Sequence, residues 1–164
     1  AAAYDRKVIF EQGINGAREI ECSVLGNDEP DVSVPGEVVP SNEFYDYDAK
    51  YVDGRSTVLI PAPLPRTVVT AIRRMAAAAY RAIDCAGMAR ADFFYVARSR
   101  RLIINELNTI PGFTSISMYP KMWEAGGLPF PRLLGRLVDL ALARHAQKTA
   151  LRRTYDPSRE WYRP

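Results

Sequence analysis

Hydrophobic and polar residues alternate along several short stretches of the chain, which is the pattern of a β-strand with one buried face. In the clearest stretch, Ile20, Cys22 and Val24 fall on one side, while acidic and hydroxyl residues fall on the other. Two longer stretches are joined by a turn around 98–100, which predicts an antiparallel hairpin. Together with β-forming residues at 7–11 and a short strand at 37–39, these stretches predict five strands, at 7–11, 18–25, 37–39, 88–97 and 102–107.

Two other segments repeat their apolar residues at helical spacing. The first runs from 65 to 84, with Pro65 suited to an early helical position and Gly87 suited to a stop. The second runs from about 131 to 148. Its predicted inward face carries Leu134, Leu137, Val138 and Ala141.

Mixed strands and helices with a visible antiparallel hairpin favour an α+β fold over a doubly wound parallel sheet. Residues 26–65 are rich in Pro, Gly, Asp and Tyr, and a loop this long is often a functional lid. We expect the lid at about 40–60. One domain is predicted over 1–150, followed by a polar tail over 151–164.

Composition narrows the class of protein further. Two cysteines without CxxC spacing indicate free thiols in a reducing compartment. No apolar stretch reaches the roughly 20 residues that cross a bilayer, and the start lacks the order of a signal peptide. The net charge of +3 comes from scattered arginines, unlike the basic stripe of many nucleic-acid binders. These features predict a cytoplasmic protein that binds neither nucleic acid nor membrane.

The predicted hairpin collects the residues with most chemistry. Side chains two apart on a strand share a face, and a turn centred on Ser99 sets Asp92 opposite Glu106 and Arg90 opposite Asn108. Two facing carboxylates repel each other, so they need a shared proton or a cation. Carboxylate and amide oxygens without nearby His or Cys suit magnesium. The alternative is a plain salt bridge between Arg90 and one carboxylate.

The loop over 108–117 leaves the second strand at this predicted site. Gly112 lets backbone approach a ligand closely, and small hydroxyl residues follow it. A loop held by a rigid hairpin is a suitable place for groups that bind substrate. An ordinary Pro-Gly turn is the simpler interpretation.

Six motifs, in order from about Val8 to Ala143, resemble those of the D-alanine:D-alanine ligases, members of the ATP-grasp superfamily. Three belong to the hairpin and its loop: Arg90-Ala91-Asp92-Phe93-Phe94, Asn105 to Thr114, and Ser117-Met118-Tyr119-Pro120-Lys121. Three come earlier: Glu11-Gln12-Gly13-Ile14, Arg18-Glu19-Ile20-Glu21, and Phe44 to Tyr51. The resemblance implies the C-terminal ATP-grasp subdomain, with a mainly antiparallel sheet flanked by helices and a long lid loop.

The resemblance also implies roles for individual residues. Asp92, Glu106 and Asn108 are the implied ligands of magnesium, or of manganese in its place. Arg90 and the Gly112 N–H stabilise the tetrahedral intermediate, and Ser117 holds the carboxylate of the second D-alanine. For ATP, the segment with Glu11, Gly13 and Ile14 reads adenine, and Glu19 binds the ribose. On the lid, Lys50 binds phosphate and Tyr51 closes over the site, which favours a dipeptide product.

The implied reaction joins two D-alanines through an acyl phosphate made from ATP, for peptidoglycan precursors. The family's N-terminal and central parts have no counterpart here, so we expect this chain to be inactive alone. The resemblance also implies that the full-length enzyme is a homodimer. A different ATP-grasp carboxylate–amine ligase, or a nucleotide- or metal-binding fragment without activity, is the alternative.

Overall fold

A computed structural model describes residues 2–39, 57–114 and 116–152. Lys50, Tyr51, most of the predicted lid and nearly all of the predicted tail lie outside these residues. The described elements, in chain order, are β1 (Arg18–Gly26), β2 (Asp31–Val32), β3 (Gly36–Val39), β4 (Thr57–Leu59), α2 (Arg66–Ala82), β5 (Gly87–Val96), β6 (Arg101–Asn108), α3 (Met118–Ala125) and α4 (Phe130–Ala150). Among them, no helix is both long and apolar enough to cross a membrane.

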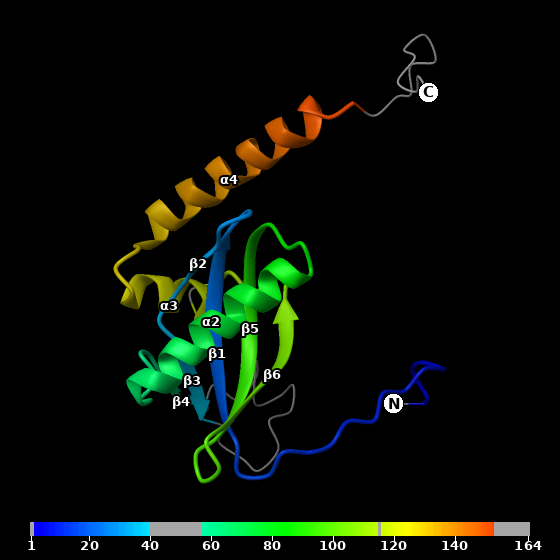
Figure 1. The fold of residues 1–164 in the computed structure, drawn as a ribbon, viewed down its shortest axis with the longest axis vertical. Coiled ribbons are helices and arrows are strands. Elements are labelled where there is room, and N and C mark those ends of the chain that lie inside the picture. The colour runs from blue at the N-terminus through cyan, green and yellow to red at the C-terminus, as the bar shows by residue number, and fades with distance from the viewer. Residues whose placement is uncertain (1, 40–56, 115, 153–164) are drawn as a thin grey trace, which may run out of the picture.

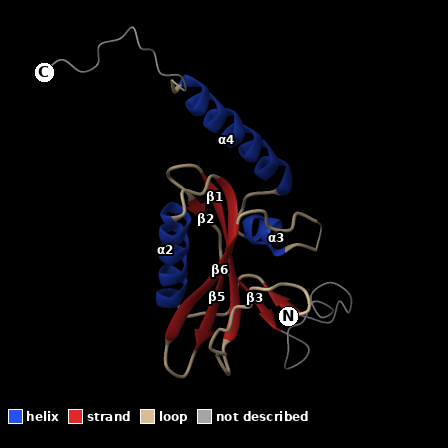
Figure 2. Cartoon of the chain, turned by 90° about the vertical axis from the view of Figure 1, so that its right-hand side faces the viewer, coloured by secondary structure: helices blue, strands red, loops and turns tan. Residues whose placement is uncertain are grey.

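The strands form one antiparallel sheet in the order β4-β3-β1-β5-β6, and β2 pairs with β1. Helices α2 and α3 lie on opposite sides of this sheet (Figure 2). Helix α4 extends away from the sheet toward the C-terminus (Figure 1). The predicted α+β class, with an antiparallel sheet flanked by helices, is confirmed.

Strand β1 is buried on both faces, so the prediction of a half-buried strand was wrong. Ile20, Cys22 and Val24 pack in the cluster that includes α2, as their alternation predicted. The opposite side is also covered, because β1 lies in the centre of the sheet beneath α3. Glu21 and Ser23 are therefore buried polar residues, and each requires a partner.

The hairpin of β5 and β6 contains a β-bulge that the sequence did not reveal. Phe93 pairs with Ile104, but Asp92 pairs with Glu106, so Asn105 has no residue opposite it. On β6 the core-facing residues are Leu102, Ile104 and Leu107, where the spacing changes from two to three. The bulge thus keeps Leu107 in the core while it turns Glu106 to the opposite face.

Helix α4 is packed by a stripe that shares Leu137 with the predicted one, whereas the predicted Leu134, Val138 and Ala141 are exposed. Leu133 is fully buried, and Leu137 and Leu140 pack partly against the cluster that includes α3. The predicted Leu134 and Val138 are instead 42% and 58% exposed. Apolar residues occur on more than one side of this helix, so periodicity alone did not identify which side meets the sheet.

The strand predicted at 7–11 is absent: residues 2–17 contain no helix or strand. Ile9 and Phe10 are 83% and 93% exposed. Figure 1 shows this segment running away from the sheet. β-forming residues make a strand only where a neighbouring strand completes their hydrogen bonds, and none of the described strands pairs with this segment. Helix α3 and the short β2 and β4 were not predicted.

The two cysteines are expected to differ in reactivity toward a thiol reagent. Both are free, but Cys22 is fully buried and Cys85 is only partly buried. Burial raises the pKa of the Cys22 thiol from 9.0 to about 12, so little thiolate forms there at pH 8. Under native conditions at pH 8, we expect a chromogenic disulfide reagent to label Cys85 and spare Cys22.

A Cys85→Ser variant isolates the buried thiol for the same assay. Labelling should then require denaturant. Rapid reaction of Cys22 in the native Cys85→Ser protein would contradict the packing of α2 on β1.

Candidate metal and substrate site

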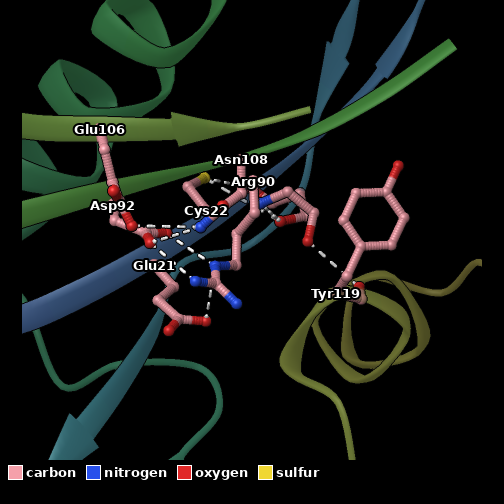
Figure 3. Close-up of polar contacts among 9 residues, drawn as sticks. Glu21, Cys22, Arg90, Asp92, Glu106, Asn108 and Tyr119 are labelled. Carbon is pink, nitrogen blue, oxygen red and sulfur yellow. Dashed lines mark hydrogen bonds and ion pairs between the residues drawn. The ribbon is translucent and has the colours of Figure 1, made fainter. Parts of the chain in front are cut away.

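The hairpin brings together all four residues that its pattern predicted. Arg90 pairs with Asn108 and Asp92 pairs with Glu106 across β5 and β6. The predicted register is therefore confirmed at these positions. Figure 3 shows the four side chains projecting into one region on the same side of the sheet.

Arg90 and Asp92 form a two-pronged ion pair. The Arg90 Nε donates to Asp92 Oδ1 and its Nη2 donates to Oδ2, both at 2.7 Å. The two side chains are 17% and 14% exposed, so water screens this pair less than it screens a surface pair. The salt bridge that the sequence offered as an alternative to a metal site is therefore present.

Asn108 lies between the two acids of the hairpin. Its Nδ2 is 3.3 Å from Asp92 Oδ2 and 3.2 Å from Glu106 Oε1. One oxygen of each carboxylate thus approaches the same amide group. If the amide turns about its last bond, its oxygen takes the place of the nitrogen, and three oxygens then face one another as ligands for a cation.

Glu21 is a further acid at this site, and the sequence reasoning did not assign it a role. It lies on β1 directly opposite Asp92, so Glu21, Asp92 and Glu106 form a row across three adjacent strands. Its Oε2 is 3.2 Å from Arg90 Nε, and its side chain is 11% exposed. Its place on the polar side of the alternating stretch indicated that Glu21 faces away from the core. The sequence pattern did not show that β1 pairs with β5.

The charges of this cluster favour a divalent cation. Glu21, Asp92 and Glu106 supply three negative charges and Arg90 supplies one positive charge, which leaves a formal excess of two negative charges. Among the described residues, no three His, Cys, Asp or Glu side chains form a group able to hold a metal by themselves. Two carboxylates and an amide instead match magnesium, which uses few protein ligands and fills its other coordination positions with water and phosphate oxygens. The residues therefore fit the ion.

The loop that follows β6 folds back on the start of α3. Thr114 N–H donates to Ser117 Oγ at 2.9 Å, and the two hydroxyls are also 2.9 Å apart. A Cβ on Gly112 would lie 3.0 Å from the same Ser117 oxygen, so Gly112 allows a close approach. Phe113 anchors the loop by ring contacts with Tyr119 and Phe130. The fold of the loop thus brings Gly112 close to Ser117.

Helix α3 is tied to the strand that borders the acidic cluster. Ser23 Oγ donates to the Tyr119 carbonyl at 3.1 Å, and the Tyr119 hydroxyl donates to the Val24 carbonyl at 2.9 Å. Ser23 is also the β1 residue opposite Arg90. These bonds place the first turn of α3 beside the cluster, where Figure 3 shows Tyr119. Burial raises the pKa of the Tyr119 hydroxyl, so it stays a neutral donor.

The predicted nucleotide-binding residues fall in two places. Glu19 lies on β1 opposite Phe94, two residues from Glu21 and on the same side of the sheet. Glu11, Gly13 and Ile14 lie in the N-terminal segment before β1, with Glu11 and Gly13 exposed. Glu19 is therefore near the acidic row, whereas the other three come from a separate segment.

An antiparallel sheet flanked by helices, with a row of acids and an arginine on one face, defines this chain as an ATP-grasp C-terminal domain. Residues 1–139 match the family described as D-ala D-ala ligase C-terminus. The chain belongs to this family.

Individual relatives support the same assignment. A D-alanine–D-alanine ligase from Heliobacterium modesticaldum is 60% identical over 148 residues, which are 90% of this chain and 40% of the relative. The D-alanine–D-alanine ligase structure from Coxiella burnetii is 44% identical with a TM-score of 0.69, covering 81% of this chain and 34% of that one. A Bacillus anthracis D-alanine–D-alanine ligase complexed with ATP is 28% identical with a TM-score of 0.68, covering 84% and 43%. The chain thus spans less than half the length of these relatives.

Proposed function

We propose that this chain is the C-terminal catalytic part of an ATP-dependent ligase that joins two D-alanines into D-alanyl-D-alanine. The observation that carries this proposal is the convergence of Arg90, Asp92, Glu106 and Asn108 on one side of the hairpin. It is supported by the family match over residues 1–139 and by relatives that are named as D-alanine–D-alanine ligases.

In this proposal, Asp92, Glu106 and Asn108 hold Mg²⁺, or Mn²⁺ in its place. When bound, such an ion neutralises negative charge on ATP phosphates. The formal excess of two negative charges in the cluster and the position of the Asn108 amide between the two carboxylates support this role. Residues Glu11, Gly13, Ile14 and Glu19 then bind the adenine and ribose of ATP, and the relative from Bacillus anthracis complexed with ATP supports a nucleotide here.

The remaining residues act on the substrates of ligation. The Arg90 guanidinium and the Gly112 N–H donate to the oxyanion that forms when the amine of the second D-alanine attacks the acyl phosphate. One such donor contributes about 3 kcal/mol in comparable acyl transfer. The Ser117 hydroxyl and the Met118 N–H hold the carboxylate of the second D-alanine at the start of α3. Lys50 binds phosphate and Tyr51 closes the lid in this proposal, although both lie outside the described residues.

The wider setting follows from the same proposal. The dipeptide serves peptidoglycan precursor synthesis in the cytoplasm, and the full-length enzyme acts as a homodimer on D-alanine and ATP. The chain carries only the C-terminal part, so we propose that it does not make dipeptide by itself.

A chimera tests this function. The chain replaces the matching C-terminal segment of the Heliobacterium modesticaldum relative, and D-alanine-dependent phosphate release and dipeptide formation are measured. We expect both activities in the chimera and neither in the isolated chain. A folded chimera that binds Mg-ATP without forming dipeptide would favour a different ligase or a binding module instead, and dipeptide formation by the isolated chain would contradict the assignment of this part.

A further inference from the structure

Arg90 is shared between two buried carboxylates of neighbouring strands. Its Nε is 2.7 Å from Asp92 Oδ1 and 3.2 Å from Glu21 Oε2 (Figure 3). Asp92 receives the guanidinium on both oxygens, whereas Glu21 is the more distant partner. The guanidinium therefore lies between a closer acid from its own strand and a second acid from β1.

Two partners compete for the oxygens of the Asp92 carboxylate: the Arg90 guanidinium and the proposed cation. In the proposed function, this carboxylate contributes to binding a divalent cation, yet both of its oxygens accept hydrogen bonds from Arg90. A cation at Asp92 competes with the guanidinium for these oxygens and repels its positive charge. If no other group accepted its hydrogen bonds, Arg90 would either move out of the site or prevent the cation from binding Asp92.

Glu21 has the location to resolve this competition. It is on the strand next to β5, directly opposite Asp92, and its side chain is buried to a similar extent. A buried carboxylate is costly unless it pairs with a cation or accepts hydrogen bonds. It can accept the Arg90 Nε–H while the Asp92 oxygens turn toward a cation, because both acids already lie within 3.2 Å of that nitrogen.

We propose that Glu21 is a positioning residue that keeps Arg90 at the reacting centre once a divalent cation engages Asp92. This inference rests on the proposed function. It assigns Glu21 two measurable effects: easier entry of the cation at Asp92, and retention of Arg90 where an oxyanion forms. Both effects act through Arg90, and Glu21 itself contacts neither substrate nor cation.

The test compares Glu21→Gln with a matched control in the chimera. Glu37→Gln also removes the charge of a buried glutamate paired with an arginine, since Glu37 binds Arg18 through bonds of 2.7 and 2.6 Å. Arg18 also donates to the Pro63 carbonyl. Glu37 lies opposite Ile20, which faces α2, whereas Arg90 lies opposite Ser23, which faces α3, so the control pair is on the other side of the sheet. Glu37→Gln should therefore lower the thermal unfolding midpoint while it preserves cation affinity.

The first readout is Mn²⁺ affinity in the presence of ADP, measured by electron paramagnetic resonance. We expect Glu21→Gln to weaken Mn²⁺ binding by about tenfold, as for other residues that act through a ligand. Glu37→Gln should leave it unchanged. Equal Mn²⁺ affinity in Glu21→Gln and the parent, or equal weakening in the two variants, would overturn the inference.

The second readout is ligation in a double-mutant cycle with Arg90→Lys. If Glu21 acts through Arg90, Glu21→Gln lowers kcat in the parent but has little further effect beside Arg90→Lys. Independent, multiplying effects would reject a role through Arg90. If Glu21→Gln does not fold, Glu21→Asp replaces it; this variant keeps the charge on a shorter side chain and should weaken Mn²⁺ binding while its unfolding midpoint stays near that of the parent. Parent-like Mn²⁺ affinity in a folded Glu21→Asp protein would then overturn the inference.

The two proposals fail in different ways. An active parent chimera whose Glu21 variants bind Mn²⁺ normally rejects only the role of Glu21. A folded parent chimera without ligation or Mn²⁺ binding rejects the proposed function, and this inference with it.

Discussion

Replacing Asp92 with asparagine in the chimera is expected to reduce ATP-dependent ligation by at least about a hundredfold, because a metal ion supplies several kcal/mol of charge stabilisation. The variant keeps the shape of the side chain and an oxygen that accepts from Arg90. It removes the negative charge proposed to bind the cation. Calorimetry should show weaker Mg-ATP binding alongside the kinetic loss.

Asp31→Asn is the matched control for this experiment. Asp31 accepts from Arg136 at 2.7 Å, but the two side chains are 62% and 43% exposed. An exposed pair of this kind contributes about 0–1 kcal/mol, so activity and Mg-ATP affinity should remain near those of the parent. An Asp92→Asn variant with parent-like Mg-ATP affinity would remove Asp92 from the proposed set of metal ligands.

Exchange of Glu106 and Leu107 (Glu106→Leu with Leu107→Glu) is expected to cause the largest loss of stability. The bulge turns residue 106 toward the site and residue 107 toward the core, so the exchange reverses which side chain meets each face. The exchange places a carboxylate among apolar side chains and removes leucine packing, each of which costs about 2–5 kcal/mol. Urea unfolding of the isolated chain should reveal this loss as a lower midpoint, and Mn²⁺ binding in the chimera should disappear.

Asn105→Ala is the control for this exchange, because it changes the bulge residue and keeps Glu106 and Leu107. Asn105 is exposed, and the substitution keeps the residue count that the bulge needs. We expect its unfolding free energy to lie within about 0.5 kcal/mol of the parent. Parent-like stability and Mn²⁺ affinity in the exchange variant would show that the bulge does not set the orientation of Glu106.

The arrangement of the hairpin site was predictable because its contacts are local. A short turn determines which residues of two consecutive strands face each other, so the pairing of Asp92 with Glu106 followed from position alone. The hairpin nevertheless differs from the predicted one in two ways, and the two differences cancel at the acids. The turn spans residues 97–100 and is not centred on Ser99, and the bulge at Asn105 restores the predicted pairing at the acids.

The third acid was not predictable in this way. Glu21 faces Asp92 only because β1 pairs with β5. These two strands are far apart in the sequence, since β2, β3, β4 and α2 lie between them. An alternating pattern identifies the two sides of a strand, but it does not identify the neighbouring strand. The burial of Glu21 follows from the central place of β1, which the order of strands decides.

The sequence by itself determined the α+β class, the antiparallel hairpin, helix α2 and the oxygen-rich chemistry at Asp92, Glu106 and Asn108, since these depend on local periodicity and short-range pairing. Tertiary structure alone decided the central burial of β1, the packed side of α4 and the lack of a strand at 7–11. It also brought Glu21 to Arg90, because contacts between distant segments depend on which surfaces can be buried together and not on the pattern within either segment.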